Sequence, residues 1–177
     1  MTGEALLIID MQAGMLAEVP DADGLTARVA DLADRARAAG RPVFVIQHEA
    51  EDLVAGEPEW HLAESIAPRD GDVLLPKRNA DSFIGTDLDD QLRGRGVSRV
   101  VVTGLATEFC VDSTARAALS RGYDLTLVED GHSTPAPEPD SGLTVDAIVS
   151  RYNQVLGWAD YPDRDVAVTP AADITFA

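Results

Sequence analysis

Cysteine, lysine and aromatic residues are all scarce in this sequence. The single cysteine, Cys110, excludes an internal disulfide and any metal site built from several thiolates. Aromatic residues make up only 5% of the 177 positions, which argues against a stacking platform for nucleic-acid bases. The only lysine is Lys77, whereas every other basic residue is an arginine. Something at position 77 therefore favours an ammonium group over a guanidinium group.

Positive charge and long apolar runs are also missing. The formal net charge is −17, which repels phosphate backbones and anionic lipid, so we expect neither nucleic acid nor membrane as a partner. The apolar run at residues 5–9 is too short for a membrane span, and the first residues do not follow the pattern of a secretion signal. We expect a cytoplasmic protein.

Short apolar runs alternate with helical patterns along the whole chain. Leu25, Val29, Leu32 and Ala36 recur at helical spacing, and Gly40 follows them as a stop signal. Strands are expected at 5–10, 42–48, 72–77, 98–104, 124–130 and 165–170, and helices at about 23–40, 86–94, 110–121 and 141–157. Strands that are apolar throughout are buried on both faces. The sequence therefore predicts one domain over 1–177, a three-layer doubly wound α/β fold with a mostly parallel sheet of about six strands.

Three reactive side chains fall where such sheets bind ligands, beyond the carboxyl ends of the strands. Asp10 ends the first expected strand, Lys77 ends the third, and Cys110 opens the helix after the fourth. A cysteine at a helix N-terminus is expected to favour the thiolate. Each residue also has a simpler interpretation: Cys110 as a small buried apolar residue, Asp10 as a loop cap, and Lys77 as a surface charge. Their coincidence at one edge favours an Asp–Lys–Cys site.

Four stretches resemble the isochorismatase-like cysteine hydrolases, a family that includes nicotinamidases and other amidases. They are "LLIIDMQ", "LPKRNADSFIGTDLDDQL", "VVVTGLATEFCVDSTARAALSRGYDLTLVEDGHST" and "AVTPAADI". The resemblance implies a Rossmann-like fold with Asp10, Lys77 and Cys110 as a catalytic triad. It also implies a cis peptide bond between Leu105 and Ala106, with the backbone N–H groups of Ala106 and Cys110 forming an oxyanion hole.

The function that follows is hydrolysis of a small-molecule amide or lactam through a thioester on Cys110. Two alternatives stay open. One is vinyl-ether hydrolysis of the isochorismatase type, which does not need a thiol. The other is a redox-sensing or non-catalytic binding protein, although a lone thiol makes a disulfide cycle difficult.

The expected pocket departs from the nicotinamidase pattern, in which Asp-x-His and a later His hold a metal. The carboxylate two residues before His48 is missing, and His61 alone does not complete a ligand set. We therefore expect no metal and no cofactor. The candidate substrate contacts are Gln12, His48, Trp60, Phe83 and His132. The family resemblance implies a homo-oligomer, for which the helix at 141–156 offers Tyr152, Val155, Leu156 and Trp158 as an apolar patch.

Overall fold

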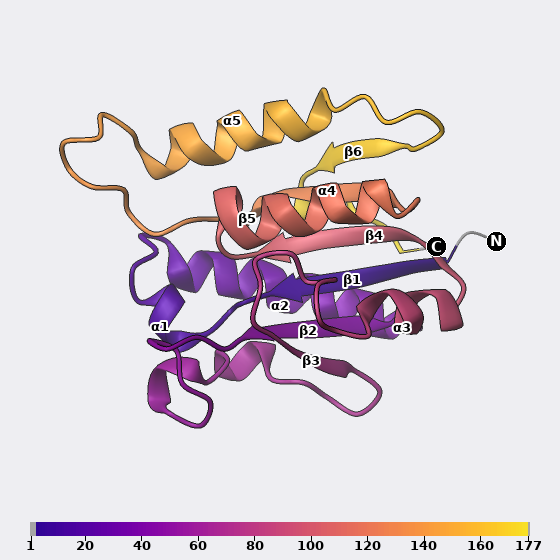
Figure 1. The fold of residues 1–177 in the computed structure, drawn as a ribbon, viewed down its shortest axis with the longest axis horizontal. Coiled ribbons are helices and arrows are strands. Elements are labelled where there is room, and N and C mark those ends of the chain that lie inside the picture. The colour runs from indigo at the N-terminus through magenta and orange to yellow at the C-terminus, as the bar shows by residue number, and fades with distance from the viewer. Residues whose placement is uncertain (1–2, 177) are drawn as a thin grey trace.

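The computed structural model describes residues 3–176, which form a six-stranded sheet with helices on both faces (Figure 1). The strands are β1 (Gly3–Ile9), β2 (Val43–His48), β3 (Val73–Lys77), β4 (Val97–Gly104), β5 (Asp124–His132) and β6 (Val166–Thr169). All neighbouring pairs are parallel, in the order β3-β2-β1-β4-β5-β6. The predicted fold class is confirmed, and the sheet is parallel throughout.

The helices are α1 (Ala13–Leu16), α2 (Ala22–Ala38), α3 (Leu88–Gly94), α4 (Asp112–Ser120) and α5 (Val145–Gly157). Buried side chains of α3, α4 and α5 share one apolar cluster with one face of the sheet, and those of α2 share a second cluster with the other face. Figure 1 shows this layering, with α4 in front of the sheet and α2 behind it. None of the helices in residues 3–176 is long and apolar enough to cross a membrane.

The sequence pattern explains the central elements. Five consecutive residues of β1, Ala5 to Ile9, are 0% exposed, because both faces of a central parallel strand are covered. The predicted stripe of α2, from Leu25 to Ala36, is buried against the sheet. Gly40 follows α2 with φ +67°, a left-handed conformation that glycine adopts without steric cost.

Some predicted details are wrong. The helix expected from Cys110 begins at Asp112 and is preceded by a wide π-type turn, Thr107–Val111. The helix expected at about 86–94 begins at Leu88, with Asp87 in the N-cap position. Leu156 is 1% exposed and packs in the core, so it does not belong to an exposed patch, whereas Trp158 is 74% exposed.

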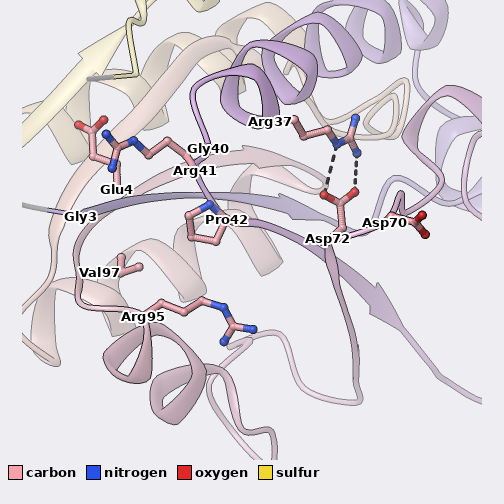
Figure 2. A pocket seen from close by; sticks show the side chains of 11 residues that line it. Gly3, Glu4, Arg37, Gly40, Arg41, Pro42, Asp70, Asp72, Arg95 and Val97 are labelled. Atoms are coloured by element: carbon pink, nitrogen blue, oxygen red, sulfur yellow. Dashed lines mark hydrogen bonds and ion pairs between the residues drawn. The ribbon is translucent and has the colours of Figure 1, made fainter.

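The topology brings the ends of distant segments to one edge. The chain runs outward from β1 through β2 to β3 and then returns to β4 on the other side of β1. The order therefore reverses between β1 and β4, which is where doubly wound sheets bind ligands. Figure 2 shows a hollow at the opposite, amino-terminal edge, where the Arg37 guanidinium pairs with the Asp72 carboxylate at 2.7 Å. None of the chemically reactive side chains discussed above lines that hollow.

Candidate active site

Lys77 is the centre of a buried polar cluster at the carboxyl edge of the sheet. Its side chain is 0% exposed, and its Nζ lies 2.7 Å from Asp10 Oδ2. The same ammonium donates to Cys110 Sγ at 3.2 Å and to the Asn79 carbonyl at 3.1 Å. It also lies 3.1 Å from His48 Nδ1. One cation is thus shared by a carboxylate, a thiol, a carbonyl and an imidazole.

Asp10 is held in place by an unusual backbone conformation just after β1. Its φ is +54°, in the left-handed region that aspartate tolerates better than most residues. Its carbonyl accepts from the Gln12 N–H at 2.8 Å, and its own N–H donates to the Ile46 carbonyl of β2 at 2.9 Å. The carboxylate is 0% exposed. Burial raises its pKa, and the nearby Lys77 ammonium offsets part of that rise.

Cys110 is brought to the same edge by the turn after β4. The Leu105–Ala106 peptide bond is cis, and the Ala106 carbonyl accepts from the N–H groups of both Phe109 and Val111, which forms the wide turn. Burial and the Asp10 charge together raise the pKa of the Cys110 thiol to about 12, against the opposing effect of Lys77. Cys110 lies in the turn two residues before α4, and burial and the Asp10 charge act against the thiolate, so the expected effect of the helix end stays a prediction.

The expected oxyanion hole remains a prediction. Among the hydrogen bonds formed within residues 3–176, none uses the Ala106 N–H as a donor. The adjacent Leu105 N–H donates to the Ile9 carbonyl of β1 at 2.9 Å. The Ala106 amide is thus a candidate donor for a ligand atom, close in sequence to the thiol.

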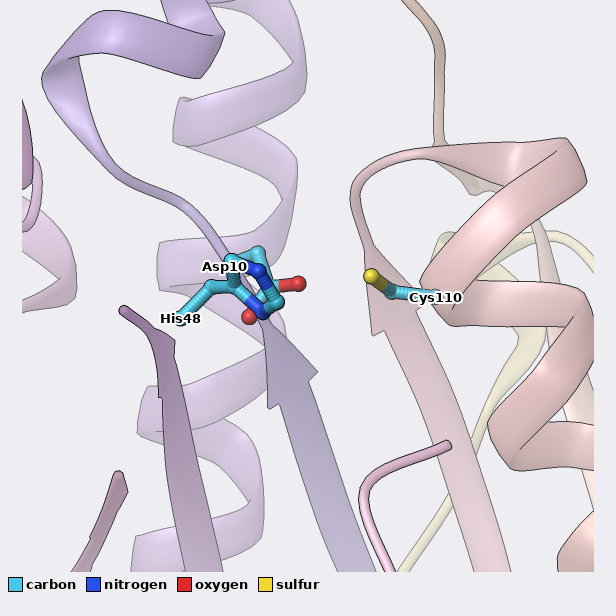
Figure 3. Close-up of side chains that lie close together, drawn as sticks. All are labelled: Asp10, His48 and Cys110. Carbon is cyan, nitrogen blue, oxygen red and sulfur yellow. The ribbon is translucent and has the colours of Figure 1, made fainter. Parts of the chain in front are cut away.

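Asp10, His48 and Cys110 also resemble a ligand set for a cation, as Figure 3 shows. Their ligand-type atoms lie within 4.8 Å of one another. The Lys77 ammonium, however, contacts all three side chains at 2.7 to 3.2 Å. Since an ammonium has no acceptor, His48 Nδ1 must carry the lone pair and the imidazole is neutral. Burial and the Lys77 charge lower the pKa of His48 in agreement with this. In this structure the Lys77 ammonium thus already connects the three candidate ligand groups.

Gln12, predicted as a substrate contact, is fully buried, and its side chain hydrogen-bonds the backbone of two distant residues. Its amide donates to the carbonyls of His48 and Trp60, each at 3.0 Å, and its Oε1 accepts from the His48 N–H at 2.8 Å. Gln12 thus holds the last residue of β2 against the loop around residue 60. Trp60 is half-buried and contacts the exposed His61 edge to face, with ring centroids 6.1 Å apart. His61 lies outside the Asp10–His48–Cys110 cluster.

The two remaining predicted substrate contacts, Phe83 and His132, also interact with other side chains of the protein. Phe83 stacks on Tyr123 at 6.1 Å between ring centroids, and the Arg121 guanidinium lies 4.6 Å from the Phe83 ring centre. His132 is 3% exposed and hydrogen-bonds Thr107 and Asn153. A role of these residues in substrate binding stays a prediction.

Sequence reasoning missed some members of the site. Asn79 takes part through its backbone carbonyl, which any residue could supply, so no sequence signal marks it. Thr107 lies inside the stretch that carries the resemblance, but its bond to His132 depends on the pairing of β4 with β5. Asn153 comes from α5, far along the chain, and no spacing rule connects it to β5.

Comparisons with known proteins agree with this geometry. A family model described as "Isochorismatase domain" matches residues 4–160. Streptothricin hydrolase from Streptomyces noursei is 36% identical over 98% of this chain and 71% of its own length. The uncharacterized isochorismatase family protein YecD from Escherichia coli O157:H7 is 36% identical, over 76% of this chain and 81% of its own.

Solved structures show the same architecture. An isochorismatase from Pseudomonas putida KT2440 superposes with a TM-score of 0.87 at 27% identity, covering 97% of this chain and 89% of the other. N-carbamoylsarcosine amidase from Thermoplasma acidophilum superposes with a TM-score of 0.78 at 25% identity, covering 98% of this chain and 99% of the other. The family model, the relatives and the shared fold agree, and this chain therefore belongs to the isochorismatase family of hydrolases.

Proposed function

We propose that this hydrolase cleaves the C–N bond of a small-molecule amide or lactam through a thioester on Cys110. The observation that carries the proposal is the buried Lys77 ammonium, which contacts the Asp10 carboxylate at 2.7 Å and the Cys110 sulfur at 3.2 Å. A carboxylate with a raised pKa accepts a proton more readily than an ordinary one, and a thiol beside a cation can deliver its proton without leaving an unpaired buried charge.

In the first half of the reaction, Asp10 takes the thiol proton as the sulfur attacks the substrate carbonyl carbon. The new S–C bond leaves a negative oxygen, which the N–H groups of Ala106 and Cys110 would hold. Lys77 stays charged and balances the thiolate as it forms. Because burial and the Asp10 charge raise the pKa of Cys110, we expect proton transfer to accompany the attack.

In the second half, Asp10 returns the proton to the leaving nitrogen, and the C–N bond breaks. Asp10 then deprotonates a water molecule, which attacks the thioester; the C–S bond breaks as Asp10 returns that proton to the sulfur, and the acid and the free thiol are released. The carboxylate thus acts in turn as base, acid, base and acid, so its burial next to a fixed cation suits all four proton transfers.

Two relatives named as an amidohydrolase and an amidase support a C–N bond as the target. Besides the streptothricin hydrolase, the ureidoacrylate amidohydrolase RutB from Klebsiella pneumoniae is 32% identical over 71% of this chain and 52% of its own length. The structural neighbour from Thermoplasma acidophilum is an amidase. A surface cavity of about 440 Å³ borders His48 and is also lined by Met15, Asp52 and Leu53; Asp10, Lys77 and Cys110 do not line it, and His48 connects it to them.

A panel of small amides, lactams and nicotinamide, assayed for released ammonia or amine, tests the proposal. Cys110→Ala is the control, and we expect it to remove turnover while the melting temperature stays near that of the wild type. Turnover of a verified substrate at the wild-type rate by Cys110→Ala would contradict the assignment of the nucleophile. Vinyl-ether cleavage that survives the loss of the thiol would support the isochorismatase-type alternative instead.

Two properties of the whole protein belong to the same proposal. The reactive thiol must stay reduced, which fits the cytoplasm. The resemblance to oligomeric hydrolases and the exposed Trp158 beside α5 support a homo-oligomer. Sedimentation equilibrium of the wild type and of Trp158→Ser tests this, and a monomeric wild type would contradict it.

A further inference from the structure

The turn that carries the cis peptide bond is tied to the neighbouring strand β5 by a short chain of buried hydrogen bonds. Thr107 Oγ1 lies 2.8 Å from His132 Nδ1, and the Thr107 N–H donates to the Ser133 carbonyl at 2.8 Å. Thr107 is 1% exposed and His132 is 3% exposed. A buried histidine with both ring nitrogens bonded is well suited to hold a turn in one position.

The direction of these bonds follows from Asn153 on α5. The Asn153 amide nitrogen donates to the Glu129 carbonyl at 3.0 Å, so the Asn153 Oδ1 faces His132 Nε2 at 2.9 Å. A carbonyl oxygen only accepts, so Nε2 carries the proton and Nδ1 has the lone pair. The Thr107 hydroxyl must then donate to Nδ1. Burial lowers the pKa of His132, which keeps this neutral form.

The bonded residue is the immediate neighbour of the candidate oxyanion donor. Thr107 follows Ala106, and the cis bond joins Ala106 to Leu105. On the other side, the Leu105 N–H is bonded to the Ile9 carbonyl of β1. The Ala106 amide is therefore held between β1 and β5, with Thr107 as the attachment on the β5 side.

We propose that Thr107, His132 and Asn153 form a positioning relay that aims the Ala106 N–H at the oxyanion. The inference rests on the proposed function, because it assumes acyl transfer to Cys110. Among the hydrogen bonds within residues 3–176, none joins these three side chains to Asp10, Lys77 or Cys110. Their contribution is to orientation, and a displacement of about 1 Å at such a donor costs about 100-fold in rate.

Two chemical probes separate this role from the reactivity of the thiol. Reaction with p-nitrophenyl acetate forms an S–C bond at the carbonyl, passes through an oxyanion and releases p-nitrophenolate. Alkylation by iodoacetamide displaces iodide at a saturated carbon and forms no oxyanion. Because Cys110 is the only cysteine, both rates report on one sulfur atom.

The variants are Thr107→Val, Thr107→Ser and Asn153→Ala. Valine keeps the shape of threonine and loses the hydroxyl, whereas serine keeps the hydroxyl and loses the methyl group. We expect Thr107→Val to lower the acylation rate about 100-fold and Thr107→Ser to stay within a few-fold of the wild type. Asn153 lies on the surface helix α5 and is half-buried, so Asn153→Ala should fold, and we expect about a tenfold loss. Alkylation should stay near the wild-type rate in all three.

Thr107→Ser reacting as slowly as Thr107→Val, or Thr107→Val acylating at the wild-type rate, would overturn the relay. Equal losses in acylation and alkylation, accompanied by a lower melting temperature, would also overturn it, since they indicate a role in folding only. If Cys110→Ala releases p-nitrophenolate as fast as the wild type, the proposed function itself fails. The two failures are thus distinguishable.

Discussion

The Lys77 ammonium has more acceptors around it than protons to give. Three N–H bonds face Asp10, His48, Asn79 and Cys110, at 2.7 to 3.2 Å from Nζ. A tetrahedral donor can redistribute its three protons as the charge moves from carboxylate to sulfur, whereas a planar guanidinium has a fixed fork and a larger volume. The side chain is 0% exposed, so no room remains for that volume. This explains the one lysine among thirteen arginines.

Replacing Asp10 by Asn separates the effect of its negative charge on the pKa of Cys110 from its role as the base. Burial and the negative charge of Asp10 raise the pKa of Cys110, and the Lys77 charge lowers it. In Asp10→Asn only the cation remains, and the thiolate becomes its counter-ion. We therefore expect the thiol pKa to fall well below about 12, although turnover drops about 10²–10⁴-fold for lack of a base. Thiolate absorbance as a function of pH, together with turnover, measures both.

Asp112→Asn is the matched control for that experiment. Asp112 lies two residues from Cys110, at the start of α4, but its carboxylate pairs with Arg116 at 2.9 Å. We expect this control to leave the thiol pKa unchanged. A thiol that titrates at the same pH in Asp10→Asn as in the wild type would mean that burial alone raises its pKa.

At the scale of elements, β1 and β4 approach so closely at their carboxyl ends that only glycine fits. Gly104 ends β4 with φ +116°, and a Cβ atom there would lie 2.0 Å from the Ile9 carbonyl oxygen. That oxygen also accepts from Leu105 and so helps to hold the cis turn. The Ile9 carbonyl oxygen is therefore next to both Gly104, the end of β4, and the turn that leads to Cys110.

We expect Gly104→Ala to destabilise the fold by more than about 2 kcal/mol, because a backbone clash adds to the strain of the positive φ. Gly142→Ala is the control, since Gly142 has φ +72° but no atom within 4 Å of the added Cβ. It isolates the conformational cost, about 1 kcal/mol. Urea unfolding measures both free energies. Equal losses in the two variants would show that the contact with Ile9 contributes nothing.

The helices and strands also show which parts of the structure can be predicted from the sequence. The stripe of α2 and the apolar run at residues 5–9 of β1 were predictable because periodicity and burial leave a regular pattern. The same strands predicted which edge would carry Asp10 and Lys77. The four residues of α1 are too few for any periodicity, and the turn before α4 depends on the Ala106 carbonyl accepting from two amides. Asn79 and Asn153 act through contacts that exist only once the sheet and α5 are assembled.

For the whole molecule, we expect the repulsion among the excess acidic side chains to exceed the attraction within the ion pairs. The chain has 31 acidic and 14 basic side chains, so 17 acids remain in excess even if every base were paired. Two like charges about 10 Å apart in water repel by about 0.4 kcal/mol, and many such pairs act together. Exposed ion pairs contribute about 0–1 kcal/mol each and are screened as well. Because repulsion exceeds attraction, screening of the charges by salt should stabilise the folded protein.

We therefore expect added NaCl to raise the melting temperature, since the screening length falls from about 30 Å at 0.01 M to about 10 Å at 0.1 M. The Lys77–Asp10 pair is 0% exposed and should be insensitive to this screening. Glu57 and Glu59 are exposed and form no ion pair within residues 3–176, so a Glu57→Gln, Glu59→Gln variant should melt higher at low salt and respond less to NaCl. A melting temperature that falls steadily with NaCl would mean that the surface pairs, and not the excess acids, dominate the electrostatics of folding.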